Sequence, residues 1–388
     1  MDAAIVGLGM TEVGRVYGRS APDFAADAVR RAVADAGLVL ADVDGLLVSS
    51  GTTRDVDVSL QRRLGLRDLR LLSEMQSFGA TAGAMLGYAA AAVTSGLAEV
   101  VACVFADSPR QPGESAGAAY AARRRFALTG APALRTVAGG NPTVQYALAA
   151  RRHMEAYGTT SEQFGAVAVA QRRWAALNPL AEMREPLTLG QHQASRWIAE
   201  PLHLLDCCLV SNGGAAVVVT RADRAADLAQ PPVHVLGVGQ GHPGHPAARG
   251  SGFGLTTGAA TSGPDALRMA GIRIEDVDIA ELYDCYTYTV VVTLEDYGFC
   301  GKGEGGSFVA EGRTAPGGPL PVNTGGGQLS GYYMWGMTPL TEAVIQARGR
   351  GGTRQVPKHD VVLVSGNGGV LDHHSTVILS PHPREGRR

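Results

Sequence analysis

The chain has 388 residues, 45% of them hydrophobic and 18% charged, a composition that is typical of a globular α/β protein and excludes a disordered or fibrous one. Its net charge of −2 gives no general attraction to nucleic acid or to an anionic membrane surface. Its five cysteines include no C-x-x-C pair, so the sequence predicts neither a disulfide framework nor a metal site, and the reducing cytoplasm is the expected compartment.

The first part of the chain predicts strands and helices in alternation. Residues 3–6 predict a strand, and because it begins almost at the N-terminus we expect no signal peptide. Gly7-Leu8-Gly9 follows, but a lone G-x-G before an irregular stretch is weak evidence for nucleotide binding. Apolar spacing predicts a helix over 22–36 and a strand over 43–48, and no apolar run is long enough to span a bilayer.

Residues 75–107 predict a loop, a helix and a buried strand in succession. The helical part, 84–93, is almost free of bulky side chains, so protein can pack around it on all sides. The strand, 100–105, is β-branched and apolar, which is typical of a strand covered on both faces. We therefore place this stretch at the centre of the fold.

A helix-rich insertion is predicted at about 110–201. It contains helices over 141–157 and 161–176, the second with an N-cap at Ser161. Beyond it, residues 215–220 predict another buried strand.

The sequence also contains a long internal repeat, in which residues 36–47 resemble 270–281 and the strand AIVGLG at the start resembles HVLGVG further on. A repeat of this length predicts two similar α/β halves, 1–230 and 231–388, that meet at a shared centre. Active sites in such folds tend to lie where the halves meet.

Several segments resemble a known family. HMEAYGTTSEQFGAVAV, ALNPLAEMREPLTL and EPLHLLDCCLVSNGGAAVVV are similar to the sterol-carrier-protein (lipid-transfer-protein) branch of the thiolase superfamily, over essentially the whole chain. The resemblance implies an α/β fold with the duplicated five-layer αβαβα architecture of thiolases, in which each half has a mixed sheet.

The four catalytic positions of thiolases can be read from this resemblance. Gly79 replaces the nucleophilic cysteine, Tyr283 begins the segment that helps to bind the thioester oxygen, and Tyr333 replaces the histidine of the G-H-P segment. Ser365 replaces the cysteine of the C-terminal C-x-G-G-G segment. Acyl transfer through a covalent acyl-enzyme needs an activated nucleophile, so thiolase activity is not expected.

A pair of tyrosines suits retro-aldol cleavage of a β-hydroxyacyl-CoA, in which one group accepts the hydroxyl proton and another protonates the enolate. This pattern resembles the cysteine-less thiolase-like aldolases of steroid side-chain degradation, which release a 17-ketosteroid and propionyl-CoA. The resemblance implies that one of Tyr283 and Tyr333 is the base and the other the acid, without deciding which. We expect Asp284 to orient its neighbours and Asn323 to hold a water or the oxyanion.

Substrate contacts are expected from glycines at these motifs, namely Gly79, Gly326, Gly368 and Gly369. His373 is a further candidate; since adjacent residues of a strand face opposite sides, at most one of His373 and His374 reaches the pocket. Tyr286, Tyr288 and Tyr332 are expected in the core or the pocket wall, and Cys207 and Cys208 as structural thiols.

Two alternative interpretations remain open beside the aldolase. In the first, the chain is a catalytically degenerate protein that binds lipids or acyl-CoA. In the second, it is a thiolase that uses a non-standard cysteine, with Cys285 the nearest candidate. The resemblance implies a homodimer, and a small OB-fold/zinc-ribbon partner that would complete a heterotetramer. No cofactor is expected, because coenzyme A is part of the substrate.

Overall fold

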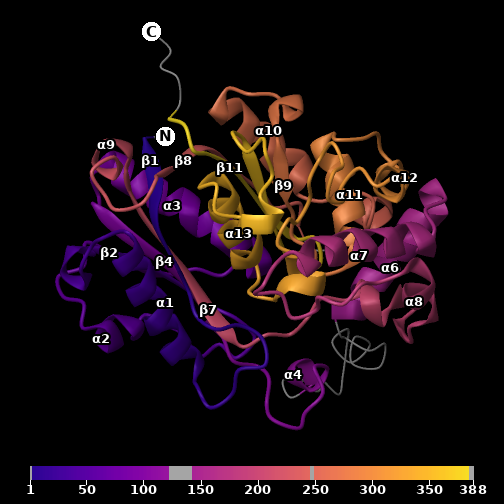
Figure 1. The fold of residues 1–388 in the computed structure, drawn as a ribbon, viewed down its shortest axis with the longest axis horizontal. Coiled ribbons are helices and arrows are strands. Elements are labelled where there is room, and N and C mark those ends of the chain that lie inside the picture. Colours follow the sequence, from indigo (N-terminus) through magenta and orange to yellow (C-terminus); the bar gives the residue numbers. More distant parts are fainter. Residues whose placement is uncertain (1, 122–141, 245–248, 384–388) are drawn as a thin grey trace.

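The computed structural model describes residues 2–121, 142–244 and 249–383, and it is built around one long mixed β-sheet (Figure 1). In the described ranges nine strands lie in the order β3 (Leu71–Glu74), β2 (Gly45–Ser50), β4 (Val100–Asp107), β7 (Gly213–Arg221), β1 (Ala3–Met10), β8 (Val233–Gly241), β11 (His373–Ser380), β10 (Val362–Gly368) and β9 (Ile279–Glu281). β2 runs parallel to β3 and β4, and β9 runs parallel to β10, whereas the other neighbouring pairs are antiparallel.

Helices cover both faces of the sheet. α3 (Thr81–Ser95) and α13 (Met337–Ala347) share one hydrophobic core with strands from both ends of the sheet. α1 (Ala21–Asp35) packs against β1, β4 and β7 in a second core. α10 (Ala259–Ala270) and α11 (Thr287–Tyr297) belong to a third core, which includes residues of β8, β9, β10 and β11. The arrangement matches the predicted layered α/β fold, with α3 in the central core. Protein does not pack around α3 on all sides as expected, because Tyr88 is 39% exposed and Ala91 is exposed as well.

The remaining helices are short or belong to the insertion. The two predicted insertion helices are confirmed, although Thr160 rather than Ser161 caps the second, because the Thr160 hydroxyl accepts the Gln163 N–H. Asn141, the predicted start of the first, lies outside the described residues. These elements are α2 (Leu60–Leu64), α4 (Ala118–Ala121), α6 (Pro142–Tyr157), α7 (Ser161–Ala176), α8 (Leu189–Ala194), α9 (Ala222–Ala225), α12 (Gly305–Ala310) and the hairpin of β5 (Trp197–Ala199) and β6 (Leu202–His203).

The internal repeat corresponds to the same local structure in both places. α1 leads through a short 3₁₀ turn into β2, and α10 leads through an equivalent turn into β9. In the matching strands β1 and β8, glycines lie where a helix packs closely against the strand. A Cβ on Gly7 would lie 2.0 Å from the Ala32 carbonyl oxygen, and one on Gly237 would lie 2.1 Å from that of Ala266. These glycines therefore allow close strand–helix packing, which explains the G-x-G without a nucleotide. The division into 1–230 and 231–388 stays a prediction.

No helix in the described ranges is both long and apolar enough to cross a membrane.

Candidate active site

A cavity of about 1250 Å³ opens where the start of α3 meets the loops of the C-terminal strands and the insertion. Its wall is strongly aromatic, with side chains from four separate parts of the chain: Phe78, Tyr146, Tyr283, Tyr286, Tyr333 and Trp335. Of the three tyrosines expected in the core or the pocket wall, Tyr286 lines the pocket, whereas Tyr288 and Tyr332 are buried in the cores. An apolar cavity with a few polar groups is the usual form of a small-molecule site.

The ring of Tyr283 occupies the space of the missing nucleophile. Gly79 lies in the short turn (Phe78–Ala80) that leads into α3, and the motif resemblance aligns it with the thiolase cysteine. A Cβ built on Gly79 would lie 2.1 Å from Cε2 and 2.3 Å from Cζ of Tyr283. No real Cβ makes such a contact, so the observed position of the Tyr283 ring requires a glycine here.

The hydroxyl groups of Tyr283 and Tyr333 are 3.2 Å apart, within hydrogen-bond reach of one another. Tyr283 follows β9, and Tyr333 follows a single π turn at Gly327–Gly331, so the two phenols come from segments 50 residues apart in sequence. The backbone N–H of Tyr333 donates to the Ser211 hydroxyl at 3.0 Å, which fixes this residue against the loop before β7. The structure thus brings together the two predicted catalytic tyrosines.

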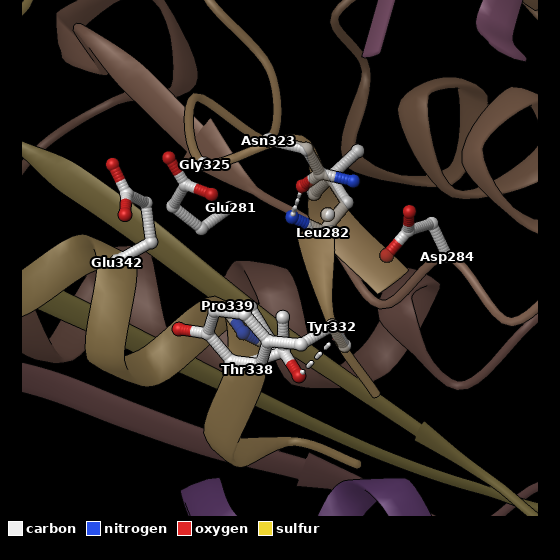
Figure 2. A pocket seen from close by; sticks show the side chains of 10 residues that line it. Glu281, Leu282, Asp284, Asn323, Gly325, Tyr332, Thr338, Pro339 and Glu342 are labelled. Carbon is white, nitrogen blue, oxygen red and sulfur yellow. Dashed lines mark hydrogen bonds between the residues drawn. The ribbon is translucent and has the colours of Figure 1, made fainter. Parts of the chain in front are cut away.

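Asp284 and Asn323 lie behind the tyrosines and, in the described part of the chain, are not among the residues that line the large cavity. They line a neighbouring cavity of about 10 Å³, room for one water, with Glu281 and Glu342 (Figure 2). Both hold the backbone of the tyrosine-bearing segments. Asn323 Oδ1 accepts the N–H of Leu282 at 2.6 Å, while the Asp284 carboxylate accepts those of Gln328 and Leu329 at 2.9 and 3.1 Å.

Burial raises the pKa of Asp284 to about 7, although the hydrogen bonds that its carboxylate accepts from backbone N–H groups favour the charged form. Burial and the nearby Glu342 carboxylate raise the pKa of Glu281 well above its usual value, which favours its protonated form. Glu342 is compensated instead by a bidentate pair with Arg354, at 2.8 and 3.0 Å. The small cavity is therefore walled by a balanced buried network.

Replacing Arg354 by methionine should lower the free energy of unfolding by about 3–5 kcal/mol, because Glu342 would remain buried without its cation. Urea denaturation at fixed protein concentration measures this. Arg268→Met is the matched control, since Arg268 pairs with Asp265 at a site where its side chain is 75% exposed, and the expected cost is below about 1 kcal/mol. Equal costs for the two variants would contradict the expectation.

The predicted substrate-binding glycines divide into two groups. Gly368 and Gly369 line the large cavity. Gly79 lies against the ring of Tyr283, which lines the cavity as well. Gly326 does not line it; its φ of +92° and the 2.5 Å approach of a Cβ to that of Ala175 show that it permits a tight turn against α7.

The histidines near the C-terminus also lie outside the residues that line the cavity in the described chain. His373 stacks on Phe78, with ring centroids 6.2 Å apart, and its Nδ1 is 3.0 Å from that of His242. His374 faces the interior, where its Nε2 is 2.9 Å from the Ser365 hydroxyl and burial lowers its pKa to about 3. A neutral His374 fixes Ser365 rather than relaying protons at neutral pH.

Three cysteines, Cys207, Cys208 and Cys285, border the cavity, and the first two also pack against the hydrophobic core. Burial raises the pKa of Cys285 to about 12 and that of Cys208 well above its usual value. A thiol of this kind is a poor nucleophile at neutral pH, because the thiolate is the reactive form.

Two further residues were not predicted as part of the site. Tyr146 of α6 donates to the Gly369 carbonyl at 2.8 Å and receives the Asn367 amide at 3.2 Å. Asn367 belongs to the S-G-N-G-G segment, which is the signal that would have pointed to it, whereas Tyr146 lies in an ordinary helical pattern. In the described part of the chain, no three His, Cys, Asp or Glu side chains converge to hold a metal ion.

Comparison with known proteins agrees with this geometry. The thiolase C-terminal domain-like family matches residues 204–381. A steroid side-chain-cleaving aldolase of Thermomonospora curvata is 40% identical over 383 residues, which covers 94% of this chain and 95% of that protein. The 17-hydroxy-3-oxo-4-pregnene-20-carboxyl-CoA lyase of Mycobacterium tuberculosis is 39% identical over 95% of this chain and 97% of its own length.

Among solved structures, the "Ltp2-ChsH2(DUF35) aldolase" superimposes with a TM-score of 0.85 and 37% identity, over 98% of this chain and 97% of that one. This likeness in sequence and structure extends over nearly the whole chain and confirms the predicted fold class. The chain therefore belongs to the thiolase superfamily, and within it to the branch of the steroid side-chain-cleaving aldolases, which makes it an enzyme of the carbon–carbon lyase class.

Proposed function

We propose that this enzyme is an acyl-CoA retro-aldolase that cleaves the CoA thioester of a 17-hydroxy steroid with a three-carbon side chain to a 17-ketosteroid and propionyl-CoA. The observation that carries the proposal is the tyrosine pair, with one ring in the space of the nucleophile and the two hydroxyls 3.2 Å apart. No covalent acyl-enzyme is formed in this scheme.

The reaction needs one base and one acid. One tyrosine, as its phenolate, takes the proton of the β-hydroxyl, the C–O bond becomes a carbonyl, and the Cα–Cβ bond breaks. The electrons of that bond form the thioester enolate, and the other tyrosine delivers a proton to Cα to give propionyl-CoA. The hydroxyl contact between Tyr283 and Tyr333 offers a direct path for returning the proton between them.

The remaining site residues support this step by position. Asp284 and Asn323 hold the backbone next to each tyrosine, so we assign them a positioning role. Gly368 and Gly369 leave room for the thioester beside the tyrosines. The aromatic wall and the volume of about 1250 Å³ suit a rigid polycyclic acyl group together with part of the pantetheine arm.

We further propose that the enzyme is a homodimer that binds a small OB-fold/zinc-ribbon protein to form a heterotetramer. The support for a partner is the similar solved structure, whose name pairs an aldolase with a DUF35 protein.

The experiment that tests the function is an assay of propionyl-CoA release from the 17-hydroxy three-carbon side-chain CoA ester, with and without such a partner. Stoichiometric release of ketone and propionyl-CoA is expected. Binding of the ester without release under either condition would favour the lipid-binding alternative.

Cys285→Ser should change kcat/KM by less than about threefold, because a thiol with a pKa of about 12 supplies no nucleophile. Steady-state assays on the same ester measure this, with Cys208→Ser as the control from the same cavity wall. Loss of activity in Cys285→Ser alone would favour the thiolase alternative.

A further inference from the structure

Asn367 borders the large cavity, and one atom of its side-chain amide is unpaired in the described part of the chain. Asn367 is in β10, lines the large cavity and is only 2% exposed. Its backbone oxygen would lie 2.2 Å from a Cβ on Gly79, so it flanks the space that Tyr283 fills. Within the described ranges, its Oδ1 is buried without a hydrogen-bond partner. Since buried polar atoms are nearly always paired, a missing donor is indicated.

The orientation of this amide follows from its neighbours. Tyr146 donates its one hydroxyl proton to the Gly369 carbonyl, which can only accept. The Tyr146 oxygen can therefore only accept from Asn367, so the NH₂ group faces Tyr146 at 3.2 Å. Oδ1 is then the free branch, and it is an acceptor. A flipped amide would set two acceptors against each other.

The proposed substrate offers few donors near its reacting carbons. The β-hydroxyl has a single proton, and the tyrosine base takes it. The thioester oxygen and the phosphates only accept. The remaining donor close to the thioester is the first amide N–H of the pantetheine arm, two methylene groups beyond the sulfur. We propose that Asn367 Oδ1 accepts a hydrogen bond from this N–H and so aligns the thioester with Tyr283 and Tyr333. This proposal rests on the proposed function.

The assignment makes Asn367 a positioning residue that also selects for coenzyme A thioesters. Tyr146, from the insertion, is the group that keeps the amide in the competent orientation. A chain of contacts from α6 through Tyr146 to Asn367 thereby links the insertion to recognition of the substrate arm.

The test compares the CoA thioester with an analogue in which an ester oxygen replaces that N–H. Wild-type enzyme should show a kcat/KM about 10- to 100-fold higher for the amide, because the analogue leaves Oδ1 unpaired. The ratio should fall to about one in Asn367→Leu, which has no acceptor oxygen. Dissociation constants of propionyl-CoA and its ester analogue give the same comparison without turnover.

Equal rates or affinities for the two compounds in the wild-type enzyme would overturn the assignment, even if Asn367→Leu does not fold. An unchanged ratio in a folded Asn367→Leu would overturn it as well. These results differ from failure of the proposed function, in which neither thioester is cleaved. Melting temperatures separate loss of folding from loss of selectivity.

Discussion

Tyr333→Phe and Tyr283→Phe should each lower kcat/KM by about 10²- to 10⁴-fold, the range typical of a removed general acid or base. Each change deletes one of two hydroxyls that lie 3.2 Å apart and leaves the ring in place. The measurement is propionyl-CoA release under steady-state conditions, with the pH profile recorded for each variant. The limb of the profile that each substitution removes identifies which tyrosine is the base.

Tyr286→Phe is the matched control for these variants, because Tyr286 lines the same cavity and its hydroxyl bonds to Thr143 at 2.8 Å. Only the severalfold effect of one lost hydrogen bond is expected. Full activity in either Tyr283→Phe or Tyr333→Phe would remove that residue from the mechanism.

Gly79→Ala should lower kcat/KM by about 10²-fold or more, although it adds only one methyl group. The new Cβ would lie 2.1 Å from the Tyr283 ring and 2.2 Å from the Asn367 carbonyl oxygen, so the tyrosine must move. A displacement of about 1 Å at a reacting group is enough for such a loss. Kinetics of the variant, with circular dichroism to confirm folding, measure the effect. For the same reason, Gly79→Cys should not restore thiolase activity.

Gly87→Ala provides the control from the same helix, α3. A Cβ there would make only ordinary contact with Val238, at 3.6 Å, so activity should be unchanged. Wild-type activity in Gly79→Ala would mean that Tyr283 is not confined as the structure indicates.

Much of the fold follows from local patterns in the sequence. The small-residue stretch is the central helix α3, and the repeat at 36–47 and 270–281 corresponds to two equivalent helix–turn–strand units. The error at the start of α7 has a local reason. Both Thr160 and Ser161 are good N-cap residues, and only the backbone conformation decides between them.

The site is less visible in the sequence, because it depends on which loops meet in space. Motif positions pointed to Tyr283 and Tyr333, which line the large cavity, and also to Asp284 and Asn323, which the structure puts behind the cavity wall. Tyr146 belongs to the insertion, whose docking is a tertiary event without a local signal. The fit of the Tyr283 ring against Gly79 likewise requires coordinates.

The measurement that tests the central claim most directly is cleavage of the 17-hydroxy side-chain CoA ester in D₂O without added free coenzyme A, followed by mass spectrometry of the products. Retro-aldol cleavage by the tyrosine pair predicts propionyl-CoA with one deuterium at Cα, one ketone per propionyl-CoA, and no acylated protein. Cleavage that requires free coenzyme A, or an acyl group attached to a cysteine of the protein, would contradict the account.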